Sequence, residues 1–310
     1  MPPSNQIIQG DCLESLKSLA DNSVDLIATD PPYFRVKGEA WDNQWSSPAK
    51  FLDWMDALCV QWKRVLKPNG SLYVFASPQM SHGVEGVIRQ HFNVLNTIRW
   101  VKQHGWHQKT NKEALRSYTS PYETVIFAEQ GGAGICEPIR AYLDGERVRA
   151  GVTMEQVRKM VGCADGSGLP SHWFTRSQWM LPTAEQYAKL QIGFNQPTPY
   201  EFLRREYEEL RRPFAVMADV PCSDVWTFAT VQPYKGKHVC EKPAALMEHI
   251  IASSSRPGAV VLDCFMGSNA TGKAARKLGR AYIGMELDPH WVEKARAYRE
   301  PATQPQLQFA

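Results

Sequence analysis

The sequence Val24-Asp25-Leu26-Ile27-Ala28-Thr29-Asp30-Pro31-Pro32-Tyr33 joins an apolar run to an acid, two prolines and an aromatic residue. Residues 24–28 are apolar apart from Asp25, which predicts a short buried strand. The prolines end this strand because they have no N–H group to donate, and Asp30 before Pro31 is disfavoured in the α region. Asp30 is therefore expected in a stiff turn at the carboxyl end of a strand, where open α/β sheets bind ligands.

The residues Asp30, Pro31, Pro32 and Tyr33 suit a flat ring that carries an amino group. The Asp30 carboxylate and the Pro31 carbonyl can accept hydrogen bonds from such a group, and the Tyr33 ring can stack on the flat face. An ordinary proline turn with an N-capping aspartate fits the same residues. This stretch by itself leaves both interpretations open.

Apolar runs alternate with helical patterns in the first part of the chain, which predicts an α/β fold with a doubly wound, mostly parallel sheet. The expected strands are residues 6–12, 24–28, 71–76, 94–101 and 122–128. The expected helices are residues 48–66, which end at Lys67-Pro68-Asn69-Gly70, and residues 84–91.

The alternation returns near the end of the chain, where strands of residues 259–263 and 280–286 enclose a loop with Gly267 and a helix. In such a unit the loop approaches a nucleotide cofactor closely and the helix N-terminus faces it. An acid at the end of the second strand, here Glu286, accepts hydrogen bonds from two ribose hydroxyls. The dinucleotide fingerprint is absent, because Asn269 stands at its middle glycine.

Two other interpretations apply to this loop. From Gly267 to Lys273 the spacing matches a phosphate-binding loop, but that motif needs Ser or Thr after the lysine to reach magnesium, and the sequence has Ala274. A tight turn without a ligand also accounts for the glycines. The position of Glu286, which a tight turn does not require, favours the cofactor site.

The composition changes at the glycine-rich residues 129–134, and strands and helices do not alternate again until about residue 213. Helical patterns cover residues 154–161, 182–190 and 199–210. We therefore expect a core formed by residues 1–128 and 216–310, with a largely helical insertion of residues 129–215.

Two segments are candidates for contact with nucleic acid. Residues 102–117 carry four basic residues against one acid, with a tryptophan and two histidines, which suits a phosphate backbone or simply a solvated loop. In the insertion, the helix of residues 154–161, a long glycine-containing turn and a polar segment are the parts of a helix-turn-helix reader, although many helical subdomains share them. The candidate DNA-contacting residues are Lys102, Lys109, Lys112, Arg116, Ser171, His172, Arg176, Ser177 and Gln178.

Composition excludes several classes of protein. The seven cysteines form no Cys-x-x-Cys pair, which indicates free thiols and neither a disulfide framework nor a zinc site. Neither a secretory signal nor a membrane-spanning apolar run is present, so we expect a cytoplasmic protein. No Ser-His-Asp set or metal cluster stands out. Methyl transfer from S-adenosylmethionine to an exocyclic amino group fits this pattern, because the sulfonium is already activated and catalysis is mainly orientation.

The sequence resembles the beta group of DNA amino-methyltransferases, whose motifs occur in permuted order. Asp30-Pro31-Pro32-Tyr33 is similar to the catalytic motif of that family and residues 263–268 to its cofactor loop, while Gly10-Asp11-Cys12, Lys242-Pro243 and residues 284–288 are similar to flanking elements. The resemblance covers about residues 6–128 and 220–300. It implies the S-adenosylmethionine-dependent methyltransferase fold, with the insertion as target-recognition region.

The resemblance also implies a substrate and a set of roles. Aspartate at the first motif position favours adenine, flipped out of duplex DNA, over cytosine, which more often goes with serine. Cofactor contacts are implied for Asp11, Cys12, Lys242, Asp263, Phe265, Gly267, Ser268, Glu286 and Leu287, with Lys242 meeting the cofactor carboxylate. Asn269 and Cys264 depart from the family pattern, which usually has glycine and proline there.

Alternatives stay open at this point. They are a cytosine amino-methyltransferase, a non-catalytic DNA-binding regulator, and an amino-methyltransferase that acts on RNA or protein. Homodimers are common in the resembling group, no metal is implied, and the sequence shows no nuclease motif of a partner restriction enzyme.

Overall fold

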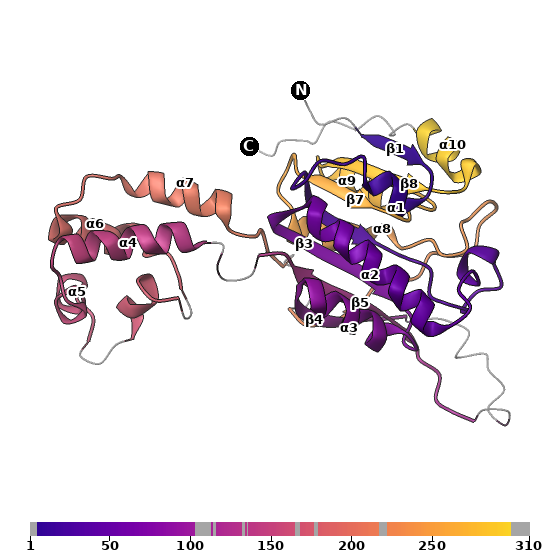
Figure 1. Ribbon diagram of the computed structural model, residues 1–310, viewed down its shortest axis with the longest axis horizontal. Coiled ribbons are helices and arrows are strands. Elements are labelled where there is room, and N and C mark those ends of the chain that lie inside the picture. Colours follow the sequence, from indigo (N-terminus) through magenta and orange to yellow (C-terminus); the bar gives the residue numbers. More distant parts are fainter. Residues whose placement is uncertain are drawn as a thin grey trace, which may run out of the picture. The chain divides into compact units, whose positions relative to one another are not determined.

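The computed structural model describes residues 5–102, 113, 116–131, 134, 136–164, 168–176, 179–216 and 222–298. The chain divides into two compact units, one of Met1–Gln130 with Pro213–Ala310 and one of Gly131–Arg212. Each unit has a hydrophobic core of its own, and Figure 1 shows the helices and strands that form each unit. Across the described ranges, no helix combines the length and the hydropathy needed to cross a membrane.

Within its described residues, the larger unit is an eight-stranded sheet covered by helices. Its strands are β1 (Gln6–Gln9), β2 (Val24–Thr29), β3 (Leu66–Ala76), β4 (Asn93–Val101), β5 (Tyr122–Glu129), β6 (Val225–Thr227), β7 (Val260–Asp263) and β8 (Ala281–Glu286). Its helices are α1 (Cys12–Leu16), α2 (Pro48–Val65), α3 (Ser81–His91), α8 (Ala244–Ser254), α9 (Ala270–Lys277) and α10 (Pro289–Ala297), with the 3₁₀ helix η1 (Ala40–Asp42).

The strand order is β1-β8-β7-β2-β3-β5-β4-β6, and only β5 runs antiparallel to its neighbours in the described sheet. The expected mostly parallel, doubly wound α/β fold is therefore confirmed. Strands β2 and β7 are direct neighbours, with Leu26 opposite Val261. The Asp-Pro-Pro-Tyr turn and the glycine loop consequently leave adjacent strands at the same edge of the sheet.

Alternation along the strands divides the core between the two faces of the sheet. In β3, Leu72, Val74 and Ala76 pack on the side of α1, α2 and α3, whereas Tyr73 and Phe75 pack on the side of α8, α9 and α10. Figure 1 shows α2 and α3 together over one face of the sheet. Because both faces are covered, the strands are apolar almost throughout, as parallel sheets require.

Asp25 is the one charged residue inside β2, and each of its carboxylate oxygens has a partner in the protein. It forms an ion pair with Lys67 (2.7 Å) and accepts a hydrogen bond from the backbone N–H of Val260 (2.8 Å). Lys67 belongs to β3, which begins at Leu66 and not at residue 71 as predicted. The register between β2 and β3 shifts after Val24, and this irregularity accommodates Pro68, which cannot donate to a regular ladder.

The smaller unit is helical in its described residues. Its elements are α4 (Glu137–Arg149), α5 (Met154–Val161), the 3₁₀ helix η5 (Leu169–Trp173), α6 (Ala184–Phe194) and α7 (Tyr200–Leu210). Thr153 and Thr183 begin α5 and α6 with complete capping boxes, each closed by a glutamine three residues later. The predicted helix of residues 154–161 is found with the same ends, and those of residues 182–190 and 199–210 are found within four residues of their expected ends.

The expected helix-turn-helix reader is not formed as predicted. Its second element, η5, is a 3₁₀ helix of five residues, and Trp173 at its end is fully buried in the core of the smaller unit. Pro170 starts this short helix, and burying Trp173 draws the segment inward. Its polar residues are therefore not carried on a second α-helix.

Candidate active site

A cavity of about 600 Å³ lies in the larger unit, at the edge where β1, β2, β7 and β8 end. It is lined by every residue predicted for catalysis or for the cofactor: Asp11, Cys12, Asp30, Pro31, Pro32, Tyr33, Lys242, Asp263, Phe265, Gly267, Ser268, Glu286 and Leu287. Its volume lies in the range of small-molecule sites. The fold thus brings the two sequence motifs into one cavity.

One of the two oxygens of the Asp30 carboxylate forms a buried ion pair. Its Oδ2 contacts the ammonium of Lys242, a residue that is 8% exposed. Its Oδ1 is buried and accepts no hydrogen bond from the part of the chain that the structure describes. A buried carboxylate oxygen without a donor is costly, so this atom is a ready acceptor for a donor that enters the cavity.

Glu123, near the start of β5, completes this cluster and was not predicted from the sequence. It accepts a hydrogen bond from the Tyr33 hydroxyl (2.8 Å) and from the Lys102 ammonium (2.5 Å), and Lys242 lies 3.3 Å away. The only signal in the sequence is an acid within an otherwise apolar strand. Glu123 holds Tyr33 by the far end of its ring.

Burial and charge set the protonation of this cluster. Burial raises the pKa of Asp30, the Lys242 ammonium opposes that shift, and Glu123 adds to it. Burial acts on Glu123 in the same way, but Lys242 and Lys102 outweigh it and lower the pKa of Glu123 to about 2. Burial raises the pKa of Tyr33 well above its ordinary value, and both carboxylates add to this, so its phenol stays protonated.

Two lysines have protein partners that the sequence did not predict. Lys242, predicted to meet the cofactor carboxylate, and Lys102, predicted to contact DNA, both form ion pairs with carboxylates of the cluster, and both predictions stay predictions. The reason is electrostatic, since two acids, Asp30 and Glu123, face the same partly dry space and need cationic partners. Burial tends to lower the pKa of Lys242, but the two acids raise it above its ordinary value, so this ammonium stays charged.

Asp263 joins the cofactor loop to the strand that carries Asp30. Its Oδ1 accepts hydrogen bonds from the Thr29 hydroxyl (2.9 Å) and the Phe265 N–H (3.1 Å), and its Oδ2 accepts from the Thr271 hydroxyl (2.6 Å). The Thr29 hydroxyl in turn accepts from the Cys264 N–H (3.1 Å). Burial raises the pKa of Asp263 to about 6 despite these donors. Asp263 therefore lines the cavity, but both of its carboxylate oxygens accept hydrogen bonds from other groups of the protein.

Glu286 and Asp11 also shape the loops around the cavity. The Glu286 carboxylate accepts from the N–H groups of Gly267 (2.8 Å) and Asp288 (2.9 Å), one on each oxygen. Asp11 caps α1 through the N–H groups of Leu13 and Glu14. Each Glu286 oxygen keeps further acceptor capacity, because a carboxylate oxygen can accept more than one hydrogen bond.

Asn269 stands where the family pattern usually has glycine, and its backbone adopts a conformation that glycine would allow. It adopts φ = 65°, a left-handed conformation that asparagine tolerates better than most residues. Its side chain is 1% exposed, and a Cβ at Gly272 would lie 2.0 Å from its Oδ1. The glycine therefore remains necessary at position 272, where the first turn of α9 packs against Asn269.

The structure describes only some of the remaining candidates for DNA contact. Lys109, Lys112, Ser177 and Gln178 lie outside the described residues. In the larger unit, Arg116 is exposed and contacts the carbonyl of Glu113 (3.4 Å). In the smaller unit, Ser171 bonds within η5 to Gly168, and His172 is half-buried in the same helix.

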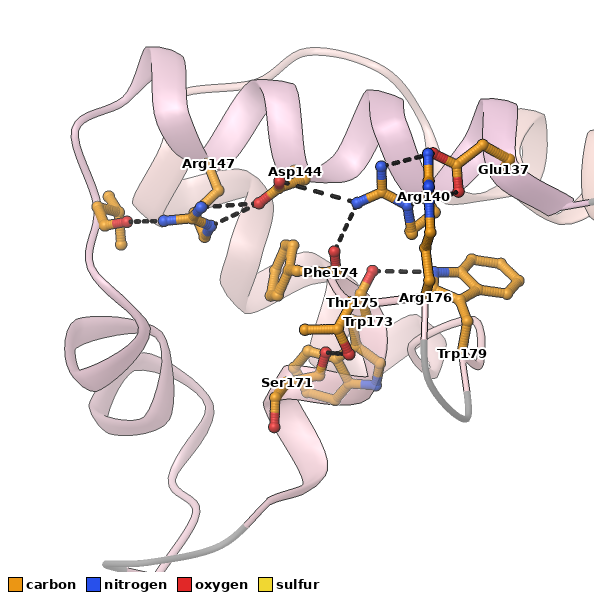
Figure 2. Close-up of polar contacts among 11 residues, drawn as sticks. Glu137, Arg140, Asp144, Arg147, Ser171, Trp173, Phe174, Thr175, Arg176 and Trp179 are labelled. Carbon is orange, nitrogen blue, oxygen red and sulfur yellow. Dashed lines mark hydrogen bonds and ion pairs between the residues drawn. The ribbon is translucent and has the colours of Figure 1, made fainter. Parts of the chain in front are cut away.

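Arg176 is the most open of these candidates, with a side chain that is 81% exposed. Figure 2 shows it beside Glu137 of α4, whose carboxylate is shared between Arg176 (3.2 Å) and Arg140 (2.7 Å). Arg140 also donates to the Phe174 carbonyl (2.6 Å) and so ties α4 to the end of η5. Hydrogen bonds from Arg140 and Arg176 lower the pKa of Glu137 to about 2.

Among the described residues, no three side chains of His, Cys, Asp or Glu converge as metal ligands. The cavity is instead lined by carboxylates, lysines, aromatic rings and backbone turns. This donor set suits hydrogen bonding to an amino group and to hydroxyls.

The sequence of the chain is similar to those of known methyltransferases. The chain is 28% identical to the DNA adenine methyltransferase YhdJ of Escherichia coli (strain K12) over 295 residues, which are 93% of this chain and 80% of that protein. It is 27% identical to the type II methyltransferase M.HinfI of Haemophilus influenzae, covering 94% of this chain and 67% of that protein.

Solved structures share the fold. PvuII DNA methyltransferase (cytosine-N4-specific) aligns with a TM-score of 0.59 at 17% identity, covering 98% of this chain and 91% of that chain. The M1.HpyAVI–SAM complex aligns with a TM-score of 0.54 at 20% identity, covering 94% and 98%. The family model described as DNA methylase (N6_N4_Mtase) matches residues 24–297, and the chain therefore belongs to this family of DNA amino-methyltransferases.

Proposed function

We propose that the protein transfers a methyl group from S-adenosylmethionine to the exocyclic amino nitrogen of adenine in duplex DNA. The observation that carries this proposal is the buried Oδ1 of Asp30, an acceptor without a donor, in the cavity that also holds Glu286 and the glycine loop. An amino group supplies the missing donor. The similarity to YhdJ, a DNA adenine methyltransferase, and to M.HinfI, a type II methyltransferase, supports this proposal.

The target base has to leave the duplex to reach this cavity, as chemistry on a stacked base requires. Asp30 Oδ1 and the Pro31 carbonyl accept the two amino hydrogens, and Tyr33 stacks on the ring. Glu123 accepts a hydrogen bond from the Tyr33 hydroxyl, which fixes the position of the far end of the side chain. These contacts orient the nitrogen lone pair out of the base plane, toward the methyl donor.

Charge around Asp30 favours the same reaction. Burial raises the pKa of Asp30 and the Lys242 ammonium opposes that shift, which favours the carboxylate form that accepts the amino hydrogen as positive charge develops on the nitrogen. No strong base is needed, because the proton becomes acidic once the nitrogen is alkylated. Methyl transfer breaks the bond between sulfur and methyl and leaves a neutral thioether, and the Asp30 carboxylate can then accept this proton.

The cofactor fits beside this pocket. When bound, S-adenosylmethionine supplies a methyl group that is already activated as a sulfonium. Glu286 accepts hydrogen bonds from the ribose hydroxyls with its free acceptor capacity, while Gly267 and Ser268 let the backbone approach closely. Leu287, 66% exposed without a ligand, offers an apolar contact for the adenine part of the cofactor.

We further propose that the smaller unit, Gly131–Arg212, recognises the target sequence, with Arg176 as a phosphate or base contact. The substrate is double-stranded DNA, and a homodimer remains a prediction from the family resemblance. A cytosine amino-methyltransferase is the alternative outcome of the same test.

The decisive experiment is incubation of the protein with labelled S-adenosylmethionine and unmethylated duplex DNA, followed by digestion and mass spectrometry of the nucleosides. We expect N6-methyladenine, and none with Asp30→Ala, which should still bind the cofactor in calorimetry. N4-methylcytosine would overturn the adenine assignment. Full transfer by a folded Asp30→Ala variant would overturn the role of Asp30.

A further inference from the structure

The loop that follows Tyr33 is held in a strained shape. Phe34 and Arg35 are consecutive residues at φ = 62° and φ = 59°, a left-handed conformation that side chains other than glycine rarely adopt. Such strain persists only where the surroundings enforce it, and it tends to occur at functional sites. The enforcing contacts here can be identified.

Asp42, the last residue of η1, provides most of them. Its side chain is 0% exposed, and its Oδ1 accepts from the Tyr33 N–H (2.7 Å). Its Oδ2 accepts from the N–H groups of Val36 (2.7 Å) and Lys37 (2.6 Å). Its backbone carbonyl accepts from the Arg35 N–H (2.8 Å). One residue therefore takes four backbone donors from five consecutive positions.

These contacts fix one wall of the cavity. Tyr33 is held at two points, by Asp42 at its backbone and by Glu123 at its hydroxyl. Val36 and Lys37, which share the other Asp42 oxygen, also line the cavity. The side chain of Asn43 supports the same turn by donating to the carbonyls of Lys37 and Glu39, both at 2.7 Å.

We propose that Asp42 is a positioning residue for the methyl transfer proposed above. Asp42 borders the cavity, but its carboxylate oxygens are engaged by backbone N–H groups, and it acts by holding the Tyr33 backbone and the Val36–Lys37 wall where the target base must stack. The proposal rests on that function, because only a base-binding site gives this rigidity a chemical purpose. A misplacement of about 1 Å at such a site lowers the rate roughly 100-fold.

The test compares Asp42→Asn with Asp53→Asn. Asn keeps the shape of Asp42 but presents an amide donor to at least one N–H group. Asp53 lies on α2, is largely exposed and pairs with Lys50 at 3.6 Å, so its substitution makes the same change of charge without touching the loop. The measurements are kcat and the KM for S-adenosylmethionine on unmethylated duplex DNA, together with the rate of trypsin cleavage after Arg35 and Lys37.

We expect Asp42→Asn to lower kcat by roughly 100-fold with little change in the KM for S-adenosylmethionine, and to speed cleavage of the loop. Asp53→Asn should match the wild type in kcat, in the KM for S-adenosylmethionine and in the cleavage rate. A wild-type kcat, or a wild-type cleavage rate, for Asp42→Asn would overturn the proposal. If the wild type itself transfers no methyl group to DNA, the proposed function fails, and the positioning role in methyl transfer fails with it, whatever the cleavage rate.

If Asp42→Asn does not fold, Asn43→Ala takes its place. This variant removes two hydrogen bonds from the same turn and leaves Asp42 intact. It should accelerate trypsin cleavage and lower kcat by a smaller factor than Asp42→Asn, again at an unchanged cofactor KM. Wild-type behaviour in both measurements would contradict the role of the turn.

Discussion

The ammonium of Lys242 contacts the carboxylate of Asp30, although 212 positions separate the two residues in the chain. This ion pair connects the loop before α8 with the turn after β2, and Glu123 shares its cation. Besides burial, which raises the pKa of Asp30, the carboxylate faces a lysine that lowers this pKa and an acid that raises it.

Lys242→Met should therefore raise the pKa of Asp30. Removing a charge this close typically shifts a carboxyl pKa by about 1–3 units, so the acidic limb of the kcat profile should move to higher pH by about that much. The measurement is single-turnover methyl transfer between pH 5 and 9. Lys277→Met is the matched control, because Lys277 forms an exposed ion pair with Glu248 at 2.8 Å. An unmoved limb would show that Lys242 does not set the charge of Asp30.

Glu123→Gln should move the same limb in the opposite direction. Glu123 raises the pKa of Asp30, so replacing it with a neutral amide lowers that pKa, while the amide oxygen can still accept from the Tyr33 hydroxyl. We expect activity to persist to lower pH. A shift toward higher pH, parallel to Lys242→Met, would mean that Glu123 acts mainly by fixing Lys242 in place.

Asp263→Asn tests a pH dependence of stability. The pKa of Asp263 is raised from 3.8 to about 6 in the folded protein, so its favourable contribution is present below pH 3.8 and is lost as the pH rises through 6. The difference corresponds to about 3 kcal/mol. Relative to the wild type, the variant should gain up to that amount between pH 4 and pH 7 in urea unfolding. Asp21→Asn, at a 69% exposed side chain, should show no such gain.

Glu286→Gln should weaken cofactor binding. The amide can keep one of the two loop hydrogen bonds but loses the negative charge and half of the acceptor capacity that the ribose requires. We expect the dissociation constant of S-adenosylmethionine to rise about tenfold in calorimetry, which corresponds to about 1.4 kcal/mol. An unchanged affinity would place the ribose elsewhere in the cavity.

Arg176 and Arg140 share Glu137 but should respond differently. Arg176→Gln should leave the melting temperature unchanged, weaken binding to duplex DNA, and reduce the salt dependence of that binding by about one counterion. Arg140→Gln removes the donor of the Phe174 carbonyl and should lower the melting temperature by several degrees. Equal DNA binding by wild type and Arg176→Gln would remove Arg176 from the interface.

Features of the structure that depend on residues close together in the chain could be predicted from the sequence. The strand before Asp30 and the helices of residues 154–161 and 199–210 follow from local patterns, and the structure has them close to their expected ends. The cofactor unit from residue 259 to Glu286 follows from the same kind of pattern, because turn chemistry and periodicity act over a few residues.

Features that depend on distant partners were missed. Glu123 gave only the weak local signal of an acid in a mostly apolar strand, since its partners Tyr33, Lys102 and Lys242 meet it only after the sheet forms. Asp42 looked like one polar residue in a loop, because its four donors come from a turn whose shape it helps to create. The early start of β3 was missed for the same reason, because its first pairing is with β2.

The hydrogen bond between Thr29 and Asp263 links the residue before Asp30 to the residue at which the cofactor loop begins. Both residues line the same cavity, so this short buried hydrogen bond joins the two walls that the proposed base and cofactor would contact, and we expect each ligand to influence the binding of the other. Coupling of this kind is reciprocal, so whatever factor the cofactor adds to the affinity for DNA, the DNA must add to the affinity for the cofactor. Thr29→Val, which deletes the connecting hydroxyl, should leave each ligand bound on its own and reduce the influence of one on the other.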